Sequence, residues 1–304
     1  MAIVSVENLK MSYDKGRVKA LKGVTFDVEE GEIFGLIGPD GAGKTSLFRI
    51  LTTLLLADSG KAVVDGMDVV NDYKKIRQHI GYMPGRFSLY HDLTVEFFNE
   101  TATTEIYTTI EENYHLVEDI YRQIEPFKKR KAGKLSGGMK QKLALSCALI
   151  HAPHVLFLDE PTTGVDPVSR KEFWEMLQKL KKNFKLSIVV STPYMDEALQ
   201  CDRIALIQDG QFLTIDTPEN IIRTYTQTLW SLRSDKMHKL LTDLRGIDGV
   251  KTAFAFGENH HATIDTSVLT VDSLRNRLVS LGHRNIVIEV VEPTIEDCFM
   301  NLQK

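Results

Sequence analysis

Cysteine is scarce in this sequence. Only three cysteines occur among 304 residues, and Cys147, Cys201 and Cys298 lie far apart, without the spacing of metal ligands. A disulfide framework is therefore excluded, and the low cysteine content is typical of a reducing compartment. We expect the three cysteines to be packing residues and the protein to be cytoplasmic.

Long apolar runs and an excess of charge of one sign are also lacking. The longest apolar stretches, such as residues 54–57 and 155–158, are far shorter than the roughly 20 residues that cross a bilayer. The first seven residues lack a basic region and a long apolar one, so we expect no secretory signal. With 37 Lys and Arg against 41 Asp and Glu, the net charge of −4 argues against nucleic acid as a partner, but not against a membrane partner.

Short β-like runs and amphipathic segments alternate from the start of the chain to about residue 220. This alternation predicts an α/β domain with a parallel sheet covered by helices. The polar helical pattern from Thr94 to Lys131 predicts a helical subdomain at about residues 86–150. Strands are expected at 3–6, 24–28, 33–37, 62–64, 80–83, 155–158, 186–190 and 204–208, and helices at 43–55, 170–182, 194–200 and from Ser136 onward.

The pattern changes between Pro218 and Thr228, where polar threonines interrupt the apolar periodicity. We therefore place a domain boundary there and expect a second domain at residues 221–304. Its predicted elements follow the order βαββαβ, which is typical of a ferredoxin-like α+β unit, and a last helix at 294–302 ends the chain. At roughly 100 to 200 residues per domain, the length of 304 residues also predicts two domains.

Residues 38–45 match the P-loop pattern of a glycine, four residues and Gly-Lys-Ser/Thr. An apolar strand leads into this loop and a helix leaves it, so backbone N–H groups and a helix N-terminus would converge on a phosphate. We expect Lys44 to reach the β- and γ-phosphates and the Thr45 hydroxyl to ligate Mg²⁺. The alternative, a glycine-rich turn without a ligand, does not account for this context. The nucleotide-binding residues predicted here are Gly38, Pro39, Asp40, Gly41, Ala42, Gly43, Lys44, Thr45 and Ser46.

Two carboxylates, Asp159 and Glu160, follow the apolar run 155–158 directly. Such a run predicts a buried strand that presents both acids at the edge of a parallel sheet. We expect Asp159 to hold Mg²⁺, through water, and Glu160 to act as the general base toward an attacking water. Alone, this pattern is most often a surface turn, but together with a P-loop it indicates a catalytic site.

A third motif lies between the other two, at residues 135–138. Ser136 is suited to cap the helix that follows, and Gly137 and Gly138 leave backbone amides accessible to a phosphate. In this order, the P-loop, the Leu-Ser-Gly-Gly signature and the Asp-Glu strand resemble the nucleotide-binding subunits of ATP-binding cassette (ABC) transporters. The resemblance covers residues 1 to about 220 and implies a P-loop NTPase fold of the ABC type with ATP and Mg²⁺ as its ligands.

The resemblance implies further roles. Tyr13 occupies the position of an aromatic residue that stacks on adenine, although its residue type alone fits a place in the core equally well. Asp166 matches a loop that crosses the dimer interface. In this family two cassettes pair head to tail, and each ATP lies between the P-loop of one chain and the signature of the other. A second ATPase subunit is therefore expected, in a homodimer or a heterodimer.

The end of the chain carries a second resemblance. Residues 292–299 are similar to the Pro-Ser/Thr-Leu-Glu-Asp-Val-Phe ending of ATPase subunits of ABC-2 type exporters, which transport drugs, polysaccharides or lipids. This similarity implies a separate membrane permease and a peripheral position on the inner face of the cell membrane. Residues 86–90 are the predicted contact with the permease. The C-terminal domain itself fits a stabilising appendage as well as a regulatory or dimerising role.

Two positions depart from the family pattern. Gly85 stands where the family usually has a glutamine near Mg²⁺, and Pro193 stands where it has a histidine near the γ-phosphate. Asp40 also replaces the commoner asparagine. Losing one preorganised contact to developing charge typically costs about 100- to 1000-fold in rate, so we favour a weakened catalytic site. Solvent or a partner chain could also substitute for the missing groups.

These motifs and departures leave two functions open. The first is the cytoplasmic ATPase subunit of an ABC exporter, whose turnover Gly85 and Pro193 would slow. The alternative is a regulatory ATP-binding subunit that hydrolyses little itself and completes the active site of a second ABC ATPase. The sequence does not reveal the transported substrate, because the contacts to it would lie in the membrane subunit.

Overall fold

The computed structural model describes residues 2–85, 91–95 and 110–303. The chain forms two compact units, Met1–Pro218 and Glu219–Lys304. The predicted permease contact at residues 86–90 lies outside the described residues, as does part of the region that the sequence predicts to be helical before α4 (Ile110–Ile124).

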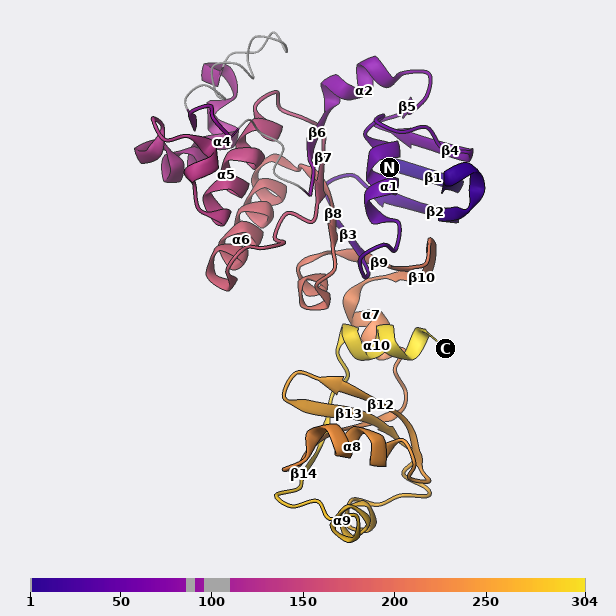
Figure 1. The fold of residues 1–304 in the computed structure, drawn as a ribbon. Helices are drawn as coiled ribbons and strands as arrows, with labels where there is room; N and C mark the ends of the chain where they lie inside the picture. The colour runs from indigo at the N-terminus through magenta and orange to yellow at the C-terminus, as the bar shows by residue number, and fades with distance from the viewer. Residues whose placement is uncertain (1, 86–90, 96–109, 304) are drawn as a thin grey trace. The chain divides into compact units, whose positions relative to one another are not determined.

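A six-stranded sheet forms the centre of the first unit (Figure 1), with the strand order β10-β9-β3-β8-β7-β6. Five strands are parallel, and β10 pairs antiparallel with β9 at one edge. All residues of β3 and β7 are buried, which explains why β3 is apolar throughout and β7 is apolar up to its last residue, Asp159. The strands are β3 (Ile33–Ile37), β6 (Ile80–Met83), β7 (Val155–Asp159), β8 (Ser187–Thr192), β9 (Arg203–Gln208) and β10 (Gln211–Asp216).

The edge strand β10 is not among the strands predicted from the sequence. This strand is half-buried and polar at several positions, so it shows no clear apolar alternation. Asp209 and Gly210 form the turn between β9 and β10, and their positive φ angles of 48° and 76° are those of a two-residue hairpin. The Asp-Gly pair between two short runs was the signal for this hairpin.

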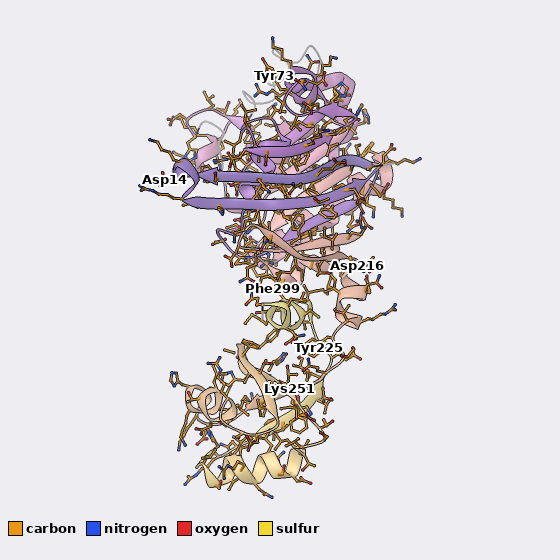
Figure 2. The ribbon with its side chains drawn as sticks, turned by 90° about the vertical axis from the view of Figure 1, so that its right-hand side faces the viewer. Asp14, Tyr73, Asp216, Tyr225, Lys251 and Phe299 are labelled. Carbon is orange, nitrogen blue, oxygen red and sulfur yellow. The ribbon has the colours of Figure 1, made fainter. Side chains whose placement is uncertain are left out.

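A second, antiparallel sheet has the strand order β2-β1-β4-β5. Its strands are β1 (Ala2–Tyr13), β2 (Val18–Glu29), β4 (Ser59–Val64) and β5 (Met67–Asp68). Figure 2 shows its long hairpin face on, with Asp14 at the tip. The first strand was predicted too short, at 3–6, because its second half alternates with charged, exposed side chains.

The helix α1 (Lys44–Leu51) lies between the two sheets and contacts both (Figure 1). Its buried Phe48 packs edge-on against Phe157 of β7. The prediction that this helix continues to residue 55 was wrong. Thr53 adopts a left-handed φ of 62°, and Leu54 and Leu56 are exposed rather than part of an apolar stripe.

Helices of the described part of the chain lie on the other side of the central sheet (Figure 1). They are α4, α5 (Gly137–Leu149) and α6 (Pro167–Phe184), whereas the short α2 (Tyr73–His79) connects β5 with β6. The segment predicted as a helix at 194–200 is a 3-10 helix, Met195–Gln200. Within the described part of the chain, no helix has the length and apolar character needed to cross a membrane.

The second unit contains one antiparallel sheet with the order β12-β13-β11-β14. This order, with one helix after β11 and one after β13, confirms the predicted ferredoxin-like arrangement. Leu240 and Leu244 of α8 and Leu274 and Leu278 of α9 pack on one face of the sheet. The elements are α7 (Pro218–Arg223), β11 (Thr228–Arg233), α8 (Met237–Leu244), β12 (Val250–Phe256), β13 (Asn259–Ile264), α9 (Val271–Ser280), β14 (Val287–Val291) and α10 (Ile295–Leu302).

The two sides of α9 give a test of this core. Leu278 is 0% exposed and its neighbour Val279 is 57% exposed. We expect Leu278→Ala to destabilise the second unit by about 2–5 kcal/mol, because it leaves a cavity, whereas Val279→Ala should change its stability by less than about 0.5 kcal/mol. Hydrogen exchange of the β11 and β13 amides measures both values. Equal effects of the two changes would contradict the packing described here.

Candidate nucleotide-binding site

The loop that joins β3 to α1 depends on two glycines. A Cβ atom on Gly38 would lie 2.1 Å from the carbonyl oxygen of Ile207 in β9. Gly43 has a φ of 106°, and a Cβ there would lie 2.3 Å from the carbonyl oxygen of Ala20 in β2. No other residue type fits either position. The loop is therefore held between the backbones of the two sheets, with its amides at the start of α1.

Lys44, the first residue of α1, is only 3% exposed. Its Nζ donates hydrogen bonds to the carbonyl oxygens of Gly38 and Pro39, at 2.7 and 2.9 Å. The same Nζ lies 3.2 Å from Oε1 of Glu160. A buried ammonium group is costly unless it is paired and hydrogen-bonded, and here both conditions are met. The lysine and the glutamate of the two predicted motifs therefore meet in one site.

The acidic side of the site is organised by Ser191, a residue that no sequence motif singles out. Its hydroxyl donates a 2.6 Å hydrogen bond to Oδ1 of Asp159 and accepts one of 3.1 Å from the backbone N–H of Glu160. Glu160 itself has a left-handed φ of 51°, a strained conformation for this residue type. Ser191 thus orients one carboxylate and holds the backbone of the other.

An open cleft of about 270 Å³ lies over the loop, lined by Tyr13, Val18, Lys19, Ala20, Asp40, Gly41, Gly43, Lys44, Thr45, Ser46 and Glu160. Tyr13 lies at its rim, with its Oη 3.0 Å from Oγ of Ser46. These groups fit a magnesium–phosphate ligand. The loop amides and the ammonium of Lys44 suit phosphate oxygens. The Thr45 hydroxyl and the nearby Asp159 carboxylate suit Mg²⁺. The exposed Asp40 belongs to the lining of this cleft.

Tyr82 of β6 lies close to the acidic side. Its burial raises the pKa of its phenol to about 12, and the charge of Asp159 acts in the same direction, whereas Arg49 lowers the pKa. The phenol therefore stays protonated at neutral pH and brings no further negative charge to the two carboxylates.

The two positions that depart from the family pattern both border the site. A Cβ on Gly85 would lie 3.0 Å from the carbonyl oxygen of Asp159 and 3.7 Å from Cβ of Glu160. Pro193 directly follows Thr192, whose carbonyl accepts a 3.3 Å hydrogen bond from the N–H of Gly38. Position 85 thus lies against the carboxylates and position 193 beside the loop, and neither residue offers a polar side-chain group.

The signature residues do not line this cleft. Ser136 caps α5 by accepting a 3.3 Å hydrogen bond from the N–H of Met139. Gly138 packs against α6, because a Cβ there would lie 2.7 Å from Oγ of Ser169. Asp166 caps α6 in turn, and the hydrogen bonds from Ser169 hold the pKa of its carboxyl below the ordinary value. Ser136 and Gly137 are exposed to solvent.

The glycine loop, the buried lysine and the paired carboxylates define a P-loop nucleotide-binding protein. A sequence model described as ABC transporter matches residues 21–163. The probable multidrug ABC transporter ATP-binding protein YbhF of Escherichia coli is 39% identical in an alignment of 226 residues that covers 71% of this chain and 38% of YbhF. The daunorubicin resistance ATP-binding protein DrrA2 of Streptomyces coeruleorubidus is 31% identical over 98% of this chain and 94% of its own length.

A solved structure shows the same fold. The ATP-binding cassette MJ0796, in a dimeric post-hydrolysis state bound to ADP and Pi, has a TM-score of 0.64 and is 26% identical over 70% of this chain and 98% of that chain. The chain therefore belongs to the ABC transporter family, as the sequence motifs predicted, and ATP with Mg²⁺ is the ligand of that family. It spans little more than a third of the length of YbhF.

The role of Ser191 can be tested against a second serine of β8. Ser187, also fully buried, lies at the other end of the strand and accepts a hydrogen bond from the N–H of Gly31. We expect Ser191→Ala to weaken the apparent affinity for Mg²⁺ in the presence of ATP by about 10- to 100-fold, because Asp159 loses its orienting donor. Ser187→Ala should leave that affinity unchanged. An unaltered Mg²⁺ dependence in folded Ser191→Ala protein would refute this role.

Proposed function

We propose that this protein is the ATP-binding and ATP-hydrolysing subunit of an ABC exporter that works with a separate membrane permease. The observation that carries this proposal is the convergence of Lys44, Thr45 and Glu160 at one cleft, with Asp159 directly before Glu160 at the end of β7. DrrA2, a drug resistance protein, matches the chain over nearly its whole length and favours an exporter. The protein would then be cytoplasmic and bound to the inner face of the cell membrane through the permease.

The residues of the site have different roles in ATP hydrolysis. Lys44 and the amides of the loop hold the phosphates, and Thr45 and Asp159 hold Mg²⁺, which neutralises phosphate charge when bound. Glu160 accepts a proton from the attacking water as the bond between the terminal phosphorus and the ADP oxygen breaks. Because phosphate oxygens compete with Glu160 for the ammonium of Lys44, binding at the loop frees the base that the reaction needs.

A second chain completes the site in this proposal. Ser136 and Gly137 begin α5 in an exposed position and do not line the cleft of their own chain. A helix N-terminus with bare amides favours an anion, so the signature would serve the ATP of a partner cassette. The partner is a second copy of this chain or a different ATPase subunit.

One observation favours a second candidate function. Gly85 and Pro193 border the site and supply no side-chain donor, whereas Lys44, Thr45 and Glu160 are present at the cleft. Binding is therefore expected to survive while the transition state loses contacts. The candidate is a regulatory ATP-binding subunit that hydrolyses ATP slowly. Its signature residues would complete the active site of a partner ATPase that has all of its catalytic groups.

The first test removes the buried cation. We expect Lys44→Ala to abolish Mg-ATP binding in calorimetry, because the loop loses its only lysine and two carbonyls lose their donor. Lys61→Ala, which removes an exposed lysine of β4, is the matched control and should bind normally. If the Lys44→Ala protein bound Mg-ATP with wild-type affinity, the assignment of this nucleotide-binding site would be refuted.

The second test restores the missing groups. We expect Gly85→Gln combined with Pro193→His to raise ATPase turnover by roughly tenfold or more, if each regained contact is worth about 1 kcal/mol in the transition state. Gly85→Ala with Pro193→Ala is the control, since it makes the same backbone changes without adding polar groups. The Cβ at position 85 is tight against Asp159, so ATP affinity is measured in parallel. Wild-type turnover of about 1–10 per second without a partner would show that these contacts are dispensable.

A further inference from the structure

Two histidines and an aspartate from three separate segments meet in the first unit. Asp65 lies in the turn between β4 and β5, His79 is the last residue of α2, and His154 directly precedes β7. The Nδ1 atoms of His79 and His154 lie 2.7 and 2.8 Å from the same oxygen, Oδ2 of Asp65. All three of these atoms lie within 4.8 Å of one another.

We propose that Asp65, His79 and His154 form a binding site for a divalent transition-metal ion of the Zn²⁺ class. Two imidazole nitrogens and one carboxylate oxygen are a ligand set that Zn²⁺ accepts, whereas Mg²⁺ and Ca²⁺ prefer oxygen ligands alone. Three protein ligands leave the fourth tetrahedral position to water.

The two distances to Asp65 need little adjustment to receive the ion. Zn²⁺ lies about 2.0–2.2 Å from nitrogen and oxygen ligands, so two ligand atoms of a tetrahedral site are roughly 3.3 Å apart. The two contacts to Asp65, now 2.7 and 2.8 Å, would each have to open by roughly half an ångström. Small rotations of exposed side chains achieve this, since the side chains of His79 and His154 are 40% and 58% exposed.

The backbones that carry the three ligands are fixed. The N–H of His154 donates a 2.8 Å hydrogen bond to the carbonyl of His79, and the parallel pairing of β6 with β7 begins at the next residue of each strand, Ile80 and Val155. The N–H of Asp65 donates a 2.8 Å hydrogen bond to the carbonyl of Ile3. The ligands are thus preorganised, which is what a metal site requires of its scaffold.

Metal binding moves one proton within each imidazole and releases none. Because the ionised carboxylate of Asp65 can only accept, Nδ1–H of each histidine donates a hydrogen bond to Oδ2. On metal binding each neutral imidazole binds through Nδ1 and carries its proton on Nε2 instead. Burial alone would raise the pKa of Asp65, but the hydrogen bonds from His79 and His154 lower it overall, so the carboxylate is ionised at neutral pH. No redox step is involved.

The adjacent histidines of β13, His260 and His261, are the more conspicuous pair in the sequence, yet they do not form a comparable cluster. Each has its own partner, the carbonyl of Met237 for His260 and the carboxylate of Asp297 for His261. Adjacent residues of a strand point to opposite faces of the sheet, so they cannot readily share one metal ion.

The site lies away from the nucleotide cleft. His154 precedes β7, whereas Asp159 ends this five-residue strand, which puts the two sites roughly 16 Å apart. Its three ligands connect the antiparallel sheet, through Asp65, with the central sheet, through the residues that precede β6 and β7. A bound ion would therefore cross-link the two sheets and stabilise the first unit.

The experiment uses the intact chain without nucleotide and titrates it with Zn²⁺ in calorimetry. The test variant combines His79→Asn with His154→Asn, because asparagine keeps an N–H donor toward Asp65 but is a poor zinc ligand. His238→Gln, which replaces an exposed histidine of the second unit, is the matched control. We expect one Zn²⁺ per chain in the wild type and the control, and an affinity at least about tenfold weaker in the double variant.

Two further readouts separate a built site from adventitious binding. Co²⁺ should give the visible absorption of a tetrahedral complex in the wild type and not in the double variant. Zn²⁺ should raise the temperature of unfolding of the wild type above that measured with a chelator, and the double variant should show no such rise. Zinc isotherms that are the same in wild type and double variant would overturn the proposal, and a stoichiometric site without thermal stabilisation would overturn the cross-linking role.

Discussion

The close approach of the loop at residues 38–43 to two neighbouring backbones is the constraint on which the site depends. Gly38 lies against Ile207 of the central sheet, and Gly43 lies against Ala20 of the antiparallel sheet. These contacts fix the direction in which α1 leaves the loop, and with it the position of Lys44. Because that lysine is buried, its charge must be met by fixed acceptors, and the loop turns the carbonyls of Gly38 and Pro39 toward the ammonium.

The carboxylates depend on a second feature, the alignment of neighbouring parallel strands. In the order β9-β3-β8-β7, the loop follows β3, Ser191 lies near the end of β8, and Asp159 ends β7, so all three reach the same edge of the sheet. The left-handed turn at Glu160 then directs its side chain back toward Lys44. A strained residue persists only where its surroundings hold it, and the two hydrogen bonds from its N–H to Ser191 do so.

Much of this arrangement was predictable because local sequence signals agreed with the fold. In the first unit, the apolar runs before Gly38 and before Asp159 indicate buried strands and the sheet edge at which they end. The βαββαβ pattern of the second unit followed from periodicity alone. The sequence did not reveal the contacts between distant segments. Ser191 is one of many serines, and nothing marks it as the partner of Asp159 until β8 and β7 are paired. The proposed zinc ligands were hidden for the same reason, since their positions show no ligand spacing.

The cluster of Asp65, His79 and His154 and the nucleotide cleft lie at opposite ends of the same two strands. The ladder of β6 and β7 runs in register from Ile80 and Val155 to Met83 and Leu158, and β7 is buried throughout. A claim of energetic coupling between distant sites needs an element with two discrete arrangements, whereas this ladder is described in one regular register. An ion at one end should therefore act on the stability of the unit and leave the chemistry at the other end to the residues that surround it.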